Sequence, residues 1–456
     1  LTFDDLTVYE MIAAADTLGV FQVESRAQTQ LQPRLKPRTF GDLIIAISLI
    51  RPGPIQGDMV HPYLRRRAGE EPVSYAHPRL EPALKETLGV ILFQEQVLKV
   101  ARDLAGFSPG QGELLRLALG SKHGAAALER FRADFLTGAQ ANGVSLDVAA
   151  AVFEQLRAFG GYAFAKSHAA AFAVLVYQSA WLKRYQPAAL LVGLLNNQPL
   201  GFWSPAVLVG DARRHGLEVL PVHITRSAAK CTLEEGRVRL GFNTVSGFGD
   251  AASARLVEAR QAAPFNHLAD LGRRTRLPHR LIEQLIRAGA LDGWGLARRQ
   301  LLWELGLLNY QADELPLELP AEGLGLPPLG ESEAQVWERE VLGLSTGPHL
   351  LTRYQAWLRG QGILSTADLK KQPANRRVRV AGLVVVHQAP PTAHGVHFLT
   401  LEDSEGLVDV ILWPPVYQQF RPVVRDSSLL IVSGEVQRDG DTVSLLARRI
   451  EPLSGP

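Results

Sequence analysis

The first two hundred residues carry apolar positions at three- and four-residue spacing, which is the pattern of helices with one buried face. Within 94–105, for example, Val97 and Leu104 belong to such a stripe, and Gly106 follows as a helix stop. The same spacing predicts further helices over 125–141, 147–159 and 169–185. The stretch 41–50 is apolar and β-branched and fits either a helix or a buried strand.

The pattern becomes mixed after about residue 207. Residues 230–242 alternate between polar and apolar around Glu235-Gly236, which predicts a hairpin, and short helices are predicted over 251–260, 280–288 and 297–308. From 311 to 330 the chain is rich in Pro, Leu, Gly and Glu without a sustained period, and this composition predicts a linker.

The last eighty or so residues alternate with period two instead. They predict short strands over 378–386, 397–402, 408–412, 429–436 and 443–447. Five strands in this length favour a small OB-type barrel. The fold class is therefore a multidomain α+β protein, with predicted domains over 1–206 (helical), 207–308 (hairpins and helices), 309–372 (linker and short helices) and 373–456 (barrel).

Composition narrows the class of protein. The chain is 46% hydrophobic and 21% charged, as in ordinary globular proteins, and its net charge is only +2, so nucleic-acid contacts need local basic patches. The one cysteine, Cys231, excludes a disulfide framework and a thiolate-rich metal site. The longest apolar run is shorter than a membrane span, so we expect a cytoplasmic protein without a membrane partner. Because the first residue is Leu1, we also expect a longer parent protein.

The sequence Val245-Ser246-Gly247-Phe248-Gly249 lies between two predicted helices. Glycines there leave backbone N–H groups facing outward, and the following helix start adds more, so Gly247 and Gly249 are candidate DNA-phosphate contacts with Arg255 nearby. Residues 277–292 look like a second, less glycine-rich hairpin. The alternative is that the glycines only permit a left-handed turn.

The predicted barrel offers aromatic side chains for stacking on single-stranded bases. They are Phe398, Trp413, Tyr417 and Phe420. The alternative is that Phe398 and Trp413 fill the core of the barrel.

Three polar clusters interrupt the first region. Arg51 begins an Arg-Pro-Gly-Pro turn, Arg116 precedes Lys122, and Lys166-Ser167-His168 opens a long apolar helix. Ser167 is the predicted N-cap, so cations and free N–H groups would converge as a triphosphate requires. The alternative is a capped helix with solvated charges, and 93–96 can likewise simply open its own helix.

Several of these motifs occur in the order and spacing of the fingers domain of bacterial C-family DNA polymerases. They are Phe21-Gln22-Val23-Glu24-Ser25, Arg51-Pro52-Gly53-Pro54, Phe93-Gln94-Glu95-Gln96, Leu114-Leu115-Arg116 and Lys166-Ser167-His168-Ala169-Ala170-Ala171-Phe172. The resemblance continues through the tandem helix-hairpin-helix and the barrel. The chain thus resembles the DNA polymerase III alpha subunit and its error-prone relatives, without their PHP and palm domains.

The resemblance implies templated DNA synthesis by two-metal phosphoryl transfer, with template-primer DNA and dNTP as partners. Mg²⁺ is expected on palm aspartates outside this chain, and none on the chain itself. The clustered acids Asp4-Asp5, Glu70-Glu71, Glu402-Asp403 and Asp439/Asp441 do not look like a metal site. We therefore expect no catalytic residue here.

By the same resemblance, residues of the fingers would line the triphosphate of the incoming nucleotide. They are Arg116, Lys122, Lys166 and His168, with Ser167 capping the helix and Arg51 and Gln94 in the same pocket. The sequence departs from the family at Leu117, where a second arginine is common. Ala163 and Ala165 also replace a glycine and an asparagine before the Lys-Ser-His motif.

The segment 311–315 lies where replicative relatives dock on the sliding clamp, but Glu314 occupies a position that is usually apolar. This favours the error-prone, translesion branch, with a sliding clamp or an accessory translesion protein as a further partner. The alternatives are a fragment of a replicative alpha subunit and a non-catalytic DNA-binding or scaffold paralogue. A nuclease would need an acidic metal cluster, which the sequence does not offer.

Overall fold

The computed structural model describes residues 1–51, 59–120, 125–160, 164–308 and 325–454. These residues form two compact units, 1–185 and 186–456, which are described separately. The boundary falls before the predicted end of the helical region at 206, so α12 (Pro187–Asn196) and α13 (Pro205–Arg214) belong to the second unit. The predicted clamp-like segment 311–315 lies outside the described residues.

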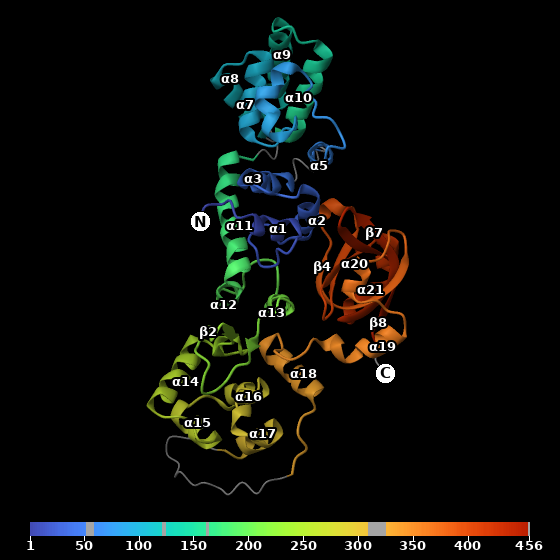
Figure 1. Ribbon diagram of the computed structural model, residues 1–456. Helices are drawn as coiled ribbons and strands as arrows, with labels where there is room; N and C mark the ends of the chain where they lie inside the picture. Colours follow the sequence, from blue (N-terminus) through green and yellow to red (C-terminus); the bar gives the residue numbers. More distant parts are fainter. Residues whose placement is uncertain (52–58, 121–124, 161–163, 309–324, 455–456) are drawn as a thin grey trace. The chain divides into compact units, whose positions relative to one another are not determined.

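The first unit is helical, as predicted (Figure 1). Its α-helices are α1 (Leu6–Ala13), α2 (Arg26–Leu35), α3 (Phe40–Leu49), α5 (Val60–Ala68), α6 (Glu81–Leu84), α7 (Gln94–Ala105), α8 (Pro109–Gly120), α9 (Ala125–Ala141), α10 (Leu146–Gly160) and α11 (Lys166–Tyr185). The ambiguous stretch 41–50 is thus mostly a helix. Thr39 and Asp42 form a capping box at its start, and α3 is buried nearly all round, which removes the amphipathic period from its sequence.

Aromatic side chains hold the first unit together at two places. The rings of Phe3 and Tyr9 pack on Tyr177 of α11, with centroids 5.1 and 5.5 Å away. Phe135 of α9 and Phe153 of α10 pack at 5.5 Å in the bundle formed by α7 to α10 (Figure 1). Long α11 also packs along α3.

The second unit begins with helices around a small three-stranded sheet. Its α-helices after α13 are α14 (Asp250–Ala262), α15 (Leu268–Thr275), α16 (His279–Arg287), α17 (Arg298–Leu307), α18 (Glu331–Leu342), α19 (Gln355–Gly360), α20 (Thr366–Lys370) and α21 (Pro414–Asp426), and its first strands are β1 (Val219–Leu220), β2 (Thr232–Glu234) and β3 (Arg237–Arg239). The predicted hairpin turns at Glu235 and Gly236, whose φ angles of 52° and 81° suit a tight two-residue turn.

The end of the chain is a closed barrel of five strands in the order β4-β5-β6-β8-β7, which confirms the predicted OB fold. The strands are β4 (Arg377–Gln388), β5 (His397–Glu402), β6 (Leu407–Leu412), β7 (Leu429–Asp439) and β8 (Thr442–Pro452). Gly434 permits the crossing of β7 and β8, because a Cβ there would lie 2.3 Å from the carbonyl oxygen of Leu446.

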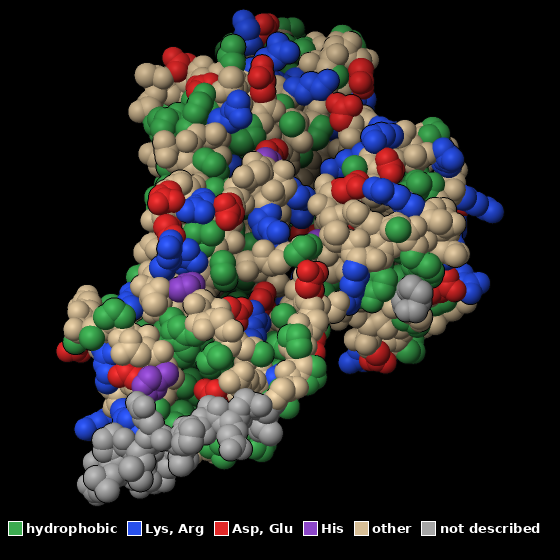
Figure 2. Space-filling model, turned by 60° about the horizontal axis from the view of Figure 1, so that its bottom comes forward, with side chains coloured by type: hydrophobic (Ala, Val, Ile, Leu, Met, Phe, Trp, Pro, Cys, Tyr) green, Lys and Arg blue, Asp and Glu red, His purple; other side chains and the backbone are tan. Residues whose placement is uncertain are grey.

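The surface carries both signs of charge. Figure 2 shows Lys and Arg side chains interspersed with Asp and Glu over the face in view, in keeping with the small net charge. Among the helices that the structure describes, none is long and apolar enough to cross a membrane.

Candidate nucleotide site and nucleic-acid interface

Two helix starts that are far apart in the sequence meet in the first unit. Phe93 and Phe164 form an isolated parallel bridge, and the amide of Gln94 donates to the carbonyl of Phe164 at 2.9 Å. The Oε1 of Gln96 accepts from the Phe93 amide at 3.0 Å and fixes the first turn of α7. The start of α7 is therefore joined to the start of α11.

Lys166 is the first residue of α11 and has two acidic partners. Its amide donates to both carboxylate oxygens of Glu95, each at 3.1 Å, and its Nζ forms an ion pair with Glu86. The Nζ also lies 5.7 Å from the centroid of the Phe93 ring. The Glu95 carboxylate thus occupies part of the positive end of α11.

The Phe164 ring contacts two further predicted residues, Arg51 and His168. The Arg51 guanidinium lies 3.7 Å from its centroid, in cation–π contact, and burial lowers the pKa of Arg51. The His168 ring meets Phe164 edge-on at 5.0 Å and lies 4.3 Å from the Phe172 ring. We name Arg51, Glu86, Phe93, Gln94, Glu95, Phe164, Lys166 and His168 together the α7–α11 cluster.

Arg116 lies on α8 and is held by an acid on its own helix. Its Nε and NH2 donate to the two carboxylate oxygens of Glu113, at 2.9 and 2.5 Å. The hydrogen bonds that Arg116 donates to Glu113 raise the pKa of Arg116, and the charge of Glu95 adds to this. The field of Glu95 therefore reaches Arg116 as well as Lys166. Lys122, the remaining predicted cation, lies outside the described residues.

The predicted N-cap of α11 is wrong. The helix begins at Lys166, and the carbonyl of Ala165 accepts its first bond, from the Ala169 amide at 3.1 Å. Ala165 therefore stands at the N-cap. Ser167 is an exposed residue of the first turn.

Sequence reasoning missed three acids of this region, namely Glu86, Glu95 and Glu113. Each accepts from a predicted cation or from its amide. Only Glu113 gave a local signal, because it precedes Arg116 by three residues on one helix. The other two are brought to Lys166 by tertiary folding alone.

The acidic pairs considered for a metal are engaged elsewhere. Asp5 caps α1 by accepting from the Thr7 amide at 2.9 Å, and the Thr7 hydroxyl, which donates to the same carboxylate at 2.6 Å, lowers the pKa of Asp5. Glu71 pairs with Arg65 and Arg66. Within either unit taken alone, the described residues bring no three His, Cys, Asp or Glu ligand atoms together.

The predicted DNA-binding glycines lie in an exposed turn of the second unit. Gly247 has a φ of 81° and Gly249 is the N-cap residue of α14. Neither amide has an acceptor among the described residues. The left-handed turn and the free amides thus occur together at this site. Arg255 is exposed on the helix that follows.

The second predicted hairpin has the same kind of turn. Gly289 after α16 has a φ of 76° and lies beside the Arg298 guanidinium, as Gly247 lies beside Arg280. Arg298 is mostly buried and pairs with Asp292 at 2.6 Å. This second turn is therefore closed by its own ion pair.

The barrel aromatics divide into two groups. Trp413 is 53% exposed, so the alternative that it fills the core is wrong. The Tyr417 and Phe420 side chains pack against the barrel core, and the Tyr417 ring stacks on His397 with centroids 3.4 Å apart. Trp413 is thus the clearest candidate for stacking on a base.

Comparison with known proteins matches all three parts of the chain. A family model of the bacterial DNA polymerase III alpha subunit finger domain matches residues 1–143. A helix-hairpin-helix motif model matches 216–301, and a model of the OB-fold nucleic acid binding domain matches 378–453.

Curated relatives match nearly the whole chain. The error-prone DNA polymerase of Azoarcus sp. (strain BH72) is 44% identical over 99% of this chain and 44% of its own length. That of Corynebacterium efficiens is 43% identical over 99% of this chain and 42% of its own length. The chain is a homologue of these error-prone DNA polymerases over nearly its whole length.

This homologue of the error-prone polymerases spans less than half the length of the curated relatives it matches. The shared part comprises the finger domain, the helix-hairpin-helix region and the OB barrel.

Proposed function

We propose that the chain is the portion of an error-prone DNA polymerase that binds the incoming dNTP and the template-primer DNA. The α7–α11 cluster takes the triphosphate of the dNTP, and the Gly247–Gly249 turn and the OB barrel bind DNA. The catalytic carboxylates belong to a palm domain, in a part of the polymerase outside this chain.

The observation that carries this proposal is the junction of α7 and α11. It brings Arg51 to Lys166 and His168 of α11 around the Phe93–Phe164 bridge. A triphosphate needs several cations close to N–H groups. The cluster places its cations at the start of α11, where Glu95 accepts from the Lys166 amide.

The acidic partners of the cluster are compatible with an exchange of ligands. The pair of Lys166 and Glu86 is exposed, with side chains 42% and 38% accessible, and exposed pairs contribute only about 0–1 kcal/mol. A triphosphate carries several negative charges, so it competes well for Lys166. We propose that Lys166 leaves Glu86 when the nucleotide binds.

Mg²⁺, when held by the palm, supplies charge neutralisation and an activated primer hydroxyl for phosphoryl transfer. The residues of this chain bind and orient the substrates. Lys166, His168 and Arg51 position the triphosphate, and the amides of Gly247 and Gly249 bind a backbone phosphate without reading a base.

Primer extension tests this division of roles. The chain alone is expected to bind primer-template DNA with an affinity that falls steeply with salt, and to extend no primer with Mg²⁺ and dNTPs. Templated extension by the chain alone would refute the assignment of the carboxylates to other polypeptide. DNA binding together with aspartate-free palm sequence upstream of Leu1 would instead favour a scaffold paralogue. Addition of a purified sliding clamp tests whether the clamp is a further partner.

A further inference from the structure

A cavity of about 450 Å³ in the second unit is not used by the proposed function. Helix α13, Arg339 of α18, the segment after α18 and the strands β4 and β5 line it. Its charged and titratable residues are Arg213, Arg214, Arg339, His349, Glu402 and Asp403. We name it the Arg339 cavity.

Two of its lining residues each carry a buried hydrogen-bond donor that has no acceptor among the described residues. The Nε of Arg339 and the Nε2 of His349 have no partner among the described residues. The Nδ1 of His349 accepts from the Leu351 amide at 3.2 Å, so the proton of the neutral ring lies on Nε2. A buried donor without an acceptor costs about 1–3 kcal/mol, so two in one cavity indicate a missing acceptor.

The two carboxylates of the cavity already accept from other groups. Glu402 accepts from the NH1 of Arg214 at 2.8 Å. Asp403 accepts from the amide and the hydroxyl of Thr366 at 2.7 and 2.6 Å, and from the Gly406 amide at 2.9 Å. Both acids are therefore committed to local partners.

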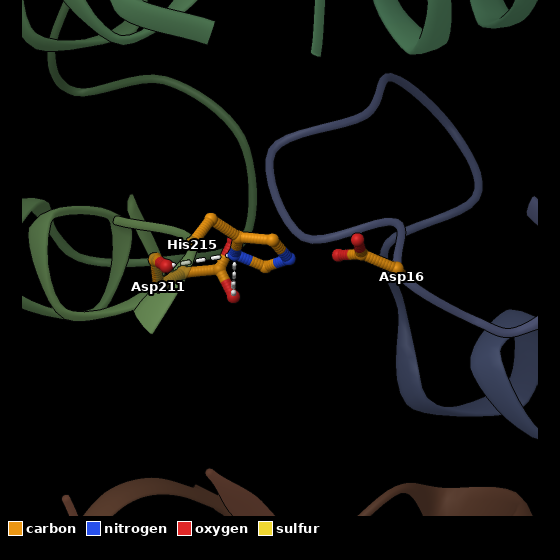
Figure 3. A group of neighbouring side chains, drawn as sticks. All are labelled: Asp16, Asp211 and His215. Atoms are coloured by element: carbon orange, nitrogen blue, oxygen red, sulfur yellow. Dashed lines mark hydrogen bonds and ion pairs between the residues drawn. The ribbon is translucent and has the colours of Figure 1, made fainter. Parts of the chain in front are cut away.

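The guanidinium groups of the wall are unevenly paired. Arg214 pairs with Glu402, whereas the Arg213 NH1 donates to a neutral carbonyl, that of Gly347. The nearby Asp211 lies 3.7 Å from both Arg214 and His215 at the end of α13 (Figure 3). Figure 3 also draws Asp16, which belongs to the first unit and pairs there with Lys183 at 2.9 Å.

We propose that the Arg339 cavity binds a phosphoryl group, whose oxygens accept from the Nε of Arg339 and the Nε2 of His349. A volume of about 450 Å³ suits a mononucleotide, and Val384 and Val385 provide apolar wall beside the charged end. The phosphoryl group belongs either to a free nucleotide or to a nucleic-acid strand, and the two sources present the same oxygens.

His349 provides a reporter that does not depend on polymerase activity. Burial lowers its pKa to about 4, and the positive charges of Arg339, Arg214 and Arg213 add to this, whereas Asp403 opposes it. A bound anion adds negative charge beside the ring, and negative charge favours the protonated form. Phosphate binding is therefore expected to raise the pKa of His349.

The experiment follows the His349 ring signal by NMR in the full chain labelled at histidine, with assignment from His349→Asn. Inorganic phosphate is added at constant ionic strength, with chloride as the reference anion. A saturable shift of the His349 signal is expected, with an apparent pKa higher by about one unit. Arg339→Gln is expected to weaken phosphate binding by about tenfold or more, and the exposed-site control Arg425→Gln to leave it unchanged.

Further measurements distinguish a free nucleotide from a nucleic-acid strand, and they distinguish lost binding from a folding defect. Tighter binding of dAMP than of a short oligonucleotide identifies a free nucleotide, and the reverse order identifies a strand. Arg339→Lys keeps the charge but lacks the Nε donor, so intermediate affinity is expected. The proposal would be overturned if phosphate, dAMP and the oligonucleotide all left the His349 signal unchanged. It would also be overturned if folded Arg339→Gln, with an unchanged Tm, bound phosphate as tightly as the parent chain.

Discussion

The backbone amide of Lys166 donates to both carboxylate oxygens of Glu95, although the two residues are 71 positions apart. This contact fixes the start of α11 against the start of α7. It also places the negative charge of Glu95 where the proposed triphosphate would bind. A nucleotide must therefore compete with the protein's own carboxylates.

Glu86 is the competitor that is easiest to remove. Because it pairs with the exposed Nζ of Lys166, Glu86→Gln in the complete polymerase should lower the apparent KM for dNTP by about two- to fivefold. Steady-state single-nucleotide incorporation measures this. A matched control is Glu81→Gln, at a second exposed acid of the same region. A higher KM in Glu86→Gln would show that Glu86 assists nucleotide binding.

A substitution at Gly249 distinguishes a loss of DNA contact from a loss of folding in the hairpin. Its φ is −99° and a Cβ there meets nothing within 4 Å, so Gly249→Val should fold and still weaken DNA binding, equally for all sequences. Gly247→Val should in addition lower the Tm, because its φ of 81° disfavours a side chain. Fluorescence anisotropy on several duplexes measures the binding. Loss confined to one duplex sequence would instead indicate base reading.

A substitution at Trp413 tests whether the surface of the OB barrel binds single-stranded DNA. It is 53% exposed, so Trp413→Ala should weaken single-stranded DNA binding by about tenfold, since stacking contributes about 1–3 kcal/mol per base, and leave the Tm nearly unchanged. Trp303 on α17 is 52% exposed and gives the matched control Trp303→Ala. Equal affinities of both variants and the parent chain would remove Trp413 from the interface.

His349 predicts a pH dependence of stability. Its pKa is about 4 in the folded chain against an ordinary 6.5, so the unfolded chain binds more protons between these values. Stability should therefore fall as the pH is lowered from about 6.5 to about 4. Urea unfolding at several pH values measures it, and the slope over this window should be smaller in His349→Asn. Equal slopes in the two proteins would contradict the buried neutral ring.

Regular patterns in the sequence predicted most of the fold. The five predicted barrel strands all fall within β4 to β8, and the predicted helix over 94–105 is α7. Strands show a period of two and helices a period of 3.6 in the sequence because one face of each element is solvated. The stretch 41–50 gave no such answer, because α3 is buried on all sides and its pattern has no polar face.

The site was only partly predictable. The motifs named Arg51, Gln94, Lys166 and His168, and the structure brings these four to one helix junction. Glu95 and Glu86 were missed, because they approach Lys166 only through packing across 71 and 80 positions. Ser167 was misplaced because helix starts are set by backbone hydrogen bonds, here at Ala165.

The most direct test of the central claim is the dNTP dependence of Lys166→Ala in the complete polymerase, compared with Lys99→Ala on the exposed face of α7. A lost charge-assisted contact to the triphosphate should raise the apparent KM for every dNTP by about tenfold or more. Lys99→Ala should keep the parent KM. An unchanged KM in Lys166→Ala would contradict the assignment of the α7–α11 cluster as the triphosphate site.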